Sequence, residues 1–230
     1  MSLIHETEQE KQMSEAFVNS AFLELSGGFQ DAYTYFTREE VFSNAQTGNV
    51  VLMSQHFMCG QWLEGLRYLF PILAFAVGVW VAEQIQGRFR YAKRLHWRQG
   101  ILLLEIIILF VVGFIPTSLD MAATALVSFA CAMQVQTFRK VNGYSYASTM
   151  CIGNLRSGIA ALSGYVREHK SSQAEQMLYY FGIIFLFALG AGVGGVLSMN
   201  PAVSIRAIWV SCALLLVSFC LMFIEKPKIS

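Results

Sequence analysis

The residues best suited to chemistry in this sequence lie in its first apolar segment. Glu24 and Asp31 are seven residues apart with Gly27 and Gly28 between them, so in a helix all four positions share one face. Gln30 lies beside this face. Because an ionisable side chain in an apolar segment is costly unless it faces a protein interior or a wet cavity, Glu24 and Asp31 are candidate proton-binding or cation-binding residues.

A structural role is the alternative for both acids. Asp31 would then lie at the level of the lipid headgroups, and Glu24 would form a static pair with a cationic side chain. Arg156, which is itself embedded in an apolar stretch, is the candidate partner. The sequence leaves the functional and the structural interpretation open.

A Gly-Asn step in each half of the chain is the second candidate feature, as Thr47-Gly48-Asn49 and as Gly153-Asn154. Glycine lets the chain leave helical geometry, and the asparagine side chain can cap the helix that follows. The free N–H groups at such a helix start can meet an anion or a polar solute. Both asparagines are therefore predicted to line a solute site, to cap a helix, or to do both.

Two glutamines of the second half add polar groups to apolar sequence. Gln134 occupies the place that Gln30 has in the first half, and Gln136 follows closely. They favour a shared polar seam, although hydrogen bonds between helices would explain them equally. No standard catalytic or nucleotide-binding motif occurs, and the five cysteines form no C-x-x-C pair. We therefore expect no enzyme, no catalytic residue, no metal and no cofactor.

The composition indicates the environment of these residues. Of the 230 residues, 13% are charged and 55% are hydrophobic, and the mean hydropathy is +0.50. Soluble domains carry about 25% charged residues. The sequence therefore predicts an all-α membrane protein, with a single transmembrane domain over residues 1–230. A net charge of +1 excludes a nucleic-acid binder, and the apolar composition excludes a disordered chain.

An internal duplication divides the chain into halves at residues 14–116 and 119–226. Three matches occur in the same order in both halves: Gly28-Phe29-Gln30 with Ala132-Met133-Gln134, Asn49 with Asn154, and residues 68–79 with residues 180–191. Each half then holds four apolar elements, at residues 14–36, 41–58, 67–86 and 99–116 and at residues 119–138, 144–166, 176–200 and 202–224. Such a repeat predicts two structurally similar units.

The distribution of Lys and Arg predicts the topology, because cytoplasmic loops collect positive charge. If all eight elements cross the membrane, nine basic residues lie inside and six outside, with Arg156 set aside. If both Gly-Asn elements re-enter instead, twelve lie inside and three, Arg38, Arg67 and Arg206, lie outside. We therefore expect six transmembrane helices, two re-entrant Gly-Asn elements, two inverted repeats and cytoplasmic termini. An eight-helix bundle is the alternative.

Three motifs in combination resemble the YoaK-type family of small bacterial inner-membrane proteins, which carry a domain of unknown function. These motifs are Gly28-Phe29-Gln30-Asp31-Ala32, Thr47-Gly48-Asn49 and Gly153-Asn154-Leu155. The resemblance implies location and topology but no activity. In the family a Thr commonly precedes the second Gly, whereas this chain has Ile152 there, so a role of the Thr47 hydroxyl need not recur in the second half.

Together these features predict a small-solute or ion transporter, or a channel-like protein, with a midplane site between inverted repeats. The candidate binding residues are Glu24, Gln30, Asp31, Thr47, Gly48, Asn49, Gln134, Gln136, Gly153, Asn154 and Arg156. The alternative is a non-transporting membrane scaffold or partner-binding subunit, whose basic loop from Arg88 to Arg98 would hold anionic lipid. The solute, and whether the chain forms a homo-oligomer, stay open.

Overall fold

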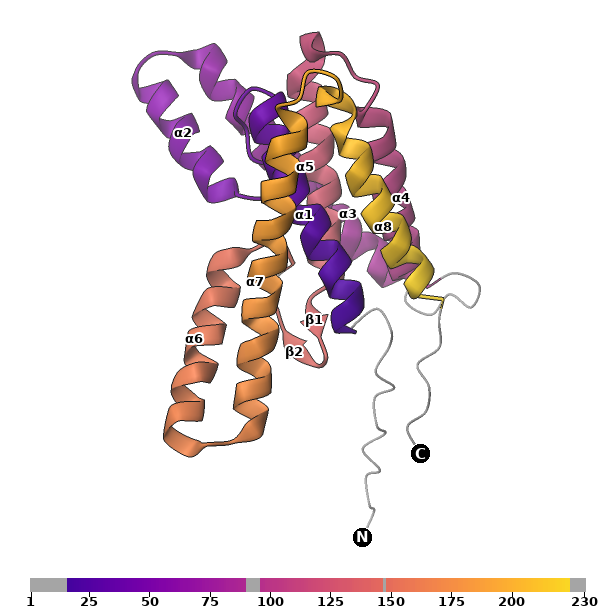
Figure 1. Ribbon diagram of the computed structural model, residues 1–230. Helices are drawn as coiled ribbons and strands as arrows, with labels where there is room; N and C mark the ends of the chain where they lie inside the picture. The colour runs from indigo at the N-terminus through magenta and orange to yellow at the C-terminus, as the bar shows by residue number, and fades with distance from the viewer. Residues whose placement is uncertain (1–15, 90–95, 147, 224–230) are drawn as a thin grey trace.

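The computed structural model describes residues 16–89, 96–146 and 148–223. Within these ranges the chain forms eight α-helices and one short β-hairpin (Figure 1). The elements are α1 (Phe17–Thr37), α2 (Gln46–Met58), α3 (Trp62–Phe89), α4 (Trp97–Val112), α5 (Asp120–Thr137), β1 (Lys140–Val141), β2 (Tyr144–Ser145), α6 (Cys151–Glu168), α7 (Ser171–Ser198) and α8 (Ile208–Leu221). Short 3₁₀ turns at Thr117–Leu119 and Ser204–Ala207 precede α5 and α8.

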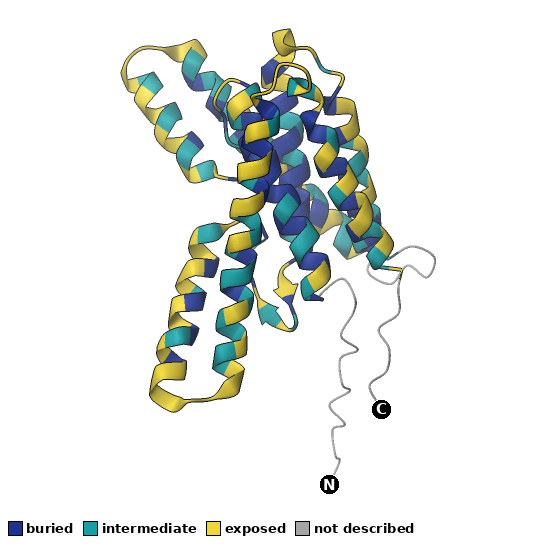
Figure 2. Ribbon diagram, in the orientation of Figure 1, coloured by how far each residue is buried: buried dark blue, intermediate teal, exposed yellow. Residues whose placement is uncertain are grey.

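Four of the described helical segments are long and apolar enough to cross a membrane: Trp62–Phe89, Thr117–Thr137, Ser171–Ser198 and Ser204–Leu221. Helices suit this environment because they satisfy their backbone hydrogen bonds internally. The segment with α5 is 61% buried, against 28% for each of the other three. Figure 2 shows the buried residues concentrated along α1 and α5 in the middle of the bundle. These two helices form the interior, and the chain is an all-α membrane protein as predicted.

Two tight crossings hold the interior helices against their neighbours. Where α1 crosses α7, a methyl group on Gly28 would lie 2.0 Å from the carbonyl oxygen of Phe187, and one on Gly190 would lie 2.1 Å from that of Leu25. Where α3 crosses α5, a methyl group on Gly78 would lie 2.4 Å from the carbonyl oxygen of Phe129. Glycine is therefore required for the backbones to approach this closely, a common device in membrane helix pairs.

The helices α2 and α6 diverge from the bundle toward its two opposite ends (Figure 1). Each forms a hairpin with the helix that follows it, α2 with α3 and α6 with α7. Before α2 the chain turns back along α1, so that the Asn44 side chain donates a hydrogen bond to the Gly27 carbonyl (3.2 Å) in the middle of α1. Before α6 the chain also turns back, and the Thr149 amide reaches Glu24. Both helices therefore begin near the middle of α1.

The start of α4 is fixed by a capping box at His96. The ring accepts a hydrogen bond from the Arg98 amide (3.3 Å), and the Gln99 side chain accepts one from the His96 amide (3.1 Å). Burial of the imidazole, with a smaller effect of nearby Arg98, lowers the pKa of His96. The ring therefore stays neutral at pH 7 and can accept this hydrogen bond.

Candidate functional site

The acidic face of α1 contacts the two chain segments that turn back into the bundle directly before α2 and α6. We call these two the returning segments. Glu24 and Asp31 are 1% and 8% exposed. The Thr149 amide donates to both oxygens of Glu24, at 3.1 and 3.3 Å. The Asn44 amide (2.7 Å) and the Ser43 hydroxyl (3.0 Å) donate to Asp31. We call these five residues the α1 junction. The predicted common face of Glu24 and Asp31 is therefore the face that binds the returning chain.

One side-chain contact joins the two returning segments to each other. The Thr149 hydroxyl donates to the Asn44 side-chain oxygen at 3.0 Å, and both residues are buried. Thr149 has a φ of 67°, an unusual left-handed conformation for a β-branched residue. Gly27 makes room for it, because a methyl group there would lie 2.1 Å from Cγ2 of Thr149. The backbone thus holds a strained residue at the centre of the junction, and such strain is typical of functional sites.

The two Gly-Asn steps lie inside the helices α2 and α6 and are not part of the junction. Asn49 is fully buried and forms two hydrogen bonds with the segment before α2. Its side chain accepts one from the Phe42 amide (3.1 Å) and donates one to the Phe42 carbonyl (2.7 Å). The predicted capping role is wrong for Asn49, because it lies inside α2, whose N-cap is Ala45. Asn154 is 2% exposed and lies inside α6. Thr47 and Gly153 are exposed, and Gly48 is half-buried.

Gln30 lies beside the acidic face of α1 and binds a different set of side chains. Its side-chain amide donates to the Ser26 hydroxyl (2.9 Å) and to Oε1 of Glu105 (3.3 Å), and its oxygen accepts from the Cys131 thiol (2.7 Å). We call these four residues the Gln30 cluster. Gln134 donates to the Leu23 carbonyl at 3.3 Å. The polar positions shared by the two halves are therefore contacts between helices.

Two predicted site residues lie apart from the α1 junction. Arg156 is exposed on α6, and among the described residues no ion pair joins it to Glu24. The expected Glu24–Arg156 pair is therefore wrong, and the Thr149 amide takes the place of Arg156. Gln136 donates to Glu83, which also pairs with Arg139 at 3.3 Å on the surface.

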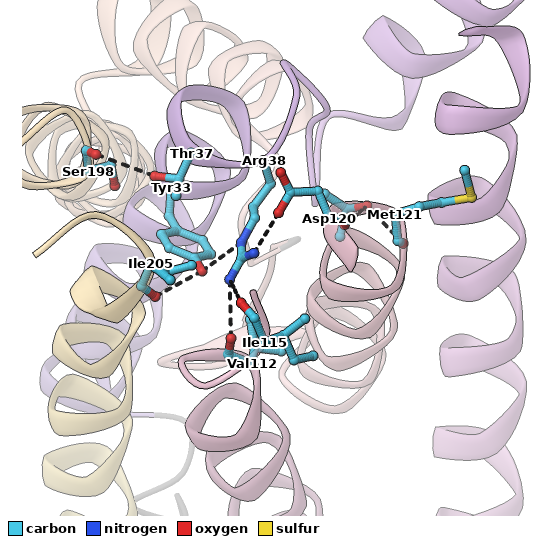
Figure 3. A network of polar contacts seen from close by, with 10 residues as sticks. Tyr33, Thr37, Arg38, Val112, Ile115, Asp120, Met121, Ser198 and Ile205 are labelled. Atoms are coloured by element: carbon cyan, nitrogen blue, oxygen red, sulfur yellow. Dashed lines mark hydrogen bonds and ion pairs between the residues drawn. The ribbon is translucent and has the colours of Figure 1, made fainter. Parts of the chain in front are cut away.

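A buried ion pair at the other end of α1 was not expected from the sequence. Arg38 is fully buried, and its guanidinium lies 2.5 Å from the carboxylate of Asp120 (Figure 3). The same group donates to the Tyr33 hydroxyl (3.0 Å) and to two carbonyls at the end of α4, Ile115 (2.9 Å) and Val112 (3.2 Å). Charge counting treated Arg38 as an ordinary loop residue, whereas it ties α1 to α4 and α5.

Two surface depressions of the described residues lie away from the acidic face of α1. One of about 280 Å³ is lined by Glu39, Glu64, Arg67 and Asp120 among others, and one of about 300 Å³ lies between α6 and α7. Neither of these two is lined by Glu24 or Asp31. No group of acidic, His and Cys side chains suited to a metal occurs among the described residues. The junction itself offers carboxylate and amide oxygens, which suit a proton, a cation or a hydrogen-bond donor.

Comparison with known proteins relates nearly the whole chain to one family. The family described as "Protein of unknown function (DUF1275)" matches residues 20–221. The chain is similar to the UPF0700 transmembrane protein YoaK of Bacillus subtilis (strain 168), with 26% identity over 219 residues, 90% of this chain and 92% of that protein. No solved structure matches the chain.

Proposed function

The chain belongs to the DUF1275 family of proteins of unknown function, and from this premise we propose that it is a small-solute or ion transporter of the bacterial inner membrane. Membership confirms the resemblance that the Gly28-Phe29-Gln30-Asp31-Ala32 and Gly-Asn motifs predict. The apolar helices and the similarity to a transmembrane protein make the chain a multi-pass membrane protein. The proposed transport site is the α1 junction.

The proposed topology has six spans, α1, α3, α4, α5, α7 and α8, with α2 and α6 as re-entrant elements and both termini in the cytoplasm. It is supported by the contacts of Asn44 and Thr149 with the middle of α1, which precede α2 and α6 directly. Chain that leaves helical geometry at this depth must be buried in protein or line a cavity. The buried Ser43, Asn44, Ser148 and Thr149 meet that condition.

An inverted repeat is supported by equivalent contacts in the two halves. In the alignment of Gln30 with Gln134, Leu25 matches Phe129, and Gly78 matches Gly190 in the third elements. Gly190 lies against the Leu25 carbonyl, and Gly78 against that of Phe129. The first helix of each half thus crosses the third helix of the other half in the same way. Transporters with inverted repeats bind their solutes between such halves.

The observation that carries the proposal is the contact between Asn44 and Thr149. Each lies five residues before its Gly-Asn asparagine, so the two positions are equivalent in the repeat. Their side chains meet at 3.0 Å, and their amides bind Asp31 and Glu24. The two returning segments therefore converge on two buried acids. A solute with positive charge or hydrogen-bond donors could replace these internal contacts.

Flux in proteoliposomes tests the proposal. The full chain is reconstituted, and the fluxes of H⁺, Na⁺ and K⁺ are followed with ion-sensitive dyes trapped inside. We expect flux of at least one ion above that of protein-free liposomes. Asp31→Asn and Asn49→Ala should reduce it to the protein-free level without lowering the fraction of folded protein. Ser128→Ala is the matched control, because Ser128 is the α5 counterpart of Glu24.

Undiminished flux in both Asp31→Asn and Asn49→Ala would refute the site. A lack of flux for all three ions would contradict ion transport and favour a scaffold or partner-binding subunit. The basic loop supports that second candidate function, with Arg88 exposed at the end of α3, although residues 90–95 lie outside the described residues. Binding of the chain to liposomes rich in anionic lipid would then be its test.

A further inference from the structure

Glu105 is a further buried carboxyl group, besides Glu24, Asp31 and Asp120, and it is not part of the α1 junction. It is in the middle of α4 and is 0% exposed. Leu102 and Leu109, about one turn away on either side, are also 0% exposed and belong to the main hydrophobic core. The carboxyl group is therefore surrounded by apolar side chains inside the membrane-spanning bundle.

The polar contacts of Glu105 are few. Its Oε1 accepts one hydrogen bond from the Gln30 amide at 3.3 Å, and its Oε2 is buried with no hydrogen-bond partner. Gln30 is otherwise engaged by Ser26 and by the Cys131 thiol. A carboxylate ordinarily accepts several hydrogen bonds when buried. The single weak contact does not solvate a negative charge.

Glu105 also has no cationic partner among the described residues. Arg38, the fully buried arginine of the bundle, is taken by Asp120 at another depth. The titratable side chains near Glu105 are Cys131 of α5 and Cys212 of α8, while α1 presents the neutral Gln30. The carboxylate of Asp31 is held by Ser43 and Asn44 instead. None of these groups can neutralise an anion at Glu105, and an unpaired buried charge is strongly disfavoured.

We propose that Glu105 is a proton-binding site, whose carboxyl group holds a proton in the closed bundle and releases it to water when the Gln30 cluster opens. In the release step the O–H bond of the carboxyl breaks, the electron pair stays on the carboxylate and the proton passes to water. No oxidation or reduction is involved. The site is distinct from Glu24 and Asp31, which lie on a neighbouring face of α1 and bind the returning segments.

Protonation of Glu105 affects the contacts between several helices, because Gln30 links Glu105 to them. Through Gln30, Glu105 of α4 is linked to Cys131 of α5 and to Ser26 of α1, and the Ser26 and Ser211 hydroxyls are 2.8 Å apart, which adds α8. Four helices therefore meet around one side-chain amide. Ionisation of Glu105 would add a charge at this meeting point, so that proton release favours an arrangement in which water reaches α4.

Infrared spectroscopy of the full chain in lipid tests the site without any transport assay. A protonated carboxyl group has a C=O stretch that is separate from the carboxylate bands and shifts in D₂O. At pH 7 we expect Glu105→Gln to remove the intensity of one protonated carboxyl group from the wild-type spectrum. On raising the pH, the wild type should convert this band into carboxylate intensity, and Glu105→Gln should lack that conversion. The matched control is Glu83→Gln, which removes an exposed carboxylate and should leave the band unchanged.

Glu105→Asp provides a second measurement that does not need the glutamine variant to fold. It keeps one protonated carboxyl group but moves its position, so the band should shift and retain its intensity. An unchanged band in Glu105→Gln and in Glu105→Asp would overturn the proposal. A wild-type spectrum without the pH-dependent conversion would overturn it as well, because Glu105 would then exchange no proton.

Discussion

The helices α1 and α5 begin the two halves of the chain and occupy similar places, yet they differ in chemistry. Both are central and mostly buried, and each crosses the third helix of the other half. At the positions of Glu24 and Asp31 in α1, however, α5 has Ser128 and Val135. The returning segments of both halves bind the acids of α1 alone. The two equivalent helix crossings therefore require glycines and small residues in both halves, whereas the acidic side chains are needed in α1 only.

The largest expected loss of stability comes from breaking the ion pair between Arg38 and Asp120, which joins α1 to α5. This residue ends α1, Asp120 begins α5, and their ion pair is buried. Arg38→Ala leaves Asp120 without its partner, and loss of one member of a buried pair lowers the free energy of unfolding by about 3–5 kcal/mol. Unfolding of the full chain by SDS titration in mixed micelles, followed by tryptophan fluorescence, measures this change.

Arg139→Ala is the control for Arg38→Ala. Arg139 pairs with Glu83, but both side chains are about half exposed, and exposed pairs contribute less than about 1 kcal/mol. Equal effects of the two substitutions would mean that Arg38 stabilises the bundle no more than a surface residue. Replacing Arg38 and Asp120 together by Met and Leu should restore most of the lost stability, because it leaves no uncompensated charge.

The second prediction concerns the crossing of α1 with α7. Gly28→Ala places a methyl group 2.0 Å from the Phe187 carbonyl oxygen, and the helices must separate to admit it. Overpacking of this kind destabilises by about 1–3 kcal/mol, or about 2–12 °C in the melting temperature. Gly192→Ala, where a methyl group would meet nothing within 4 Å, should not lower the melting temperature. In the α5 copy this position is already Ala132, so tolerance of Gly28→Ala would mean that the two crossings are interchangeable.

The spacing of residues in α1 was sufficient to predict part of the site. Glu24, Gly27 and Asp31 share a helical face, and that face binds the returning segments. The partners Asn44 and Thr149 could not be predicted in the same way, because their contacts depend on how far each segment runs back along α1. One signal for them was present: the alignment of Asn49 with Asn154 also pairs these two polar positions.

The wrong partner predicted for Arg156 and the missed pairing of Arg38 have different physical causes. Arg156 follows the buried Asn154 by two residues in α6. Residues two apart on a helix face opposite sides. Because Asn154 is buried, Arg156 is exposed and cannot form an ion pair with Glu24. Arg38 was counted as an outside loop charge because counting ignores pairing. Arg38, directly after α1, and Asp120, the first residue of α5, become a buried pair only when the two helix ends meet.

The smallest expected effect concerns the hydrogen bond between Asn44 and Thr149, through which the returning segments of the two halves meet. Asn44→Ala removes more than the shared hydrogen bond, since Asn44 also binds the Gly27 carbonyl, whereas Thr149→Val removes the hydroxyl that donates to Asn44. A double-mutant cycle cancels these other losses and isolates the contact. Side-chain hydrogen bonds inside membrane proteins average about 0.6 kcal/mol, so we expect a coupling of about that size in SDS unfolding.

A cycle of Thr149→Val with Ser54→Ala serves as the control for that coupling, because the Ser54 hydroxyl binds the Val50 carbonyl within α2 and is exposed on the protein surface. Distant pairs are additive within about 0.3–0.5 kcal/mol. If the Asn44–Thr149 cycle is equally additive, the contact between the two returning segments contributes nothing to stability, and each segment is held by its own contacts with α1. A coupling above the control means that each half fixes the position of the other. The acids of α1 could then serve both returning segments, which explains why α5 has Ser128 and Val135 at the positions that match Glu24 and Asp31.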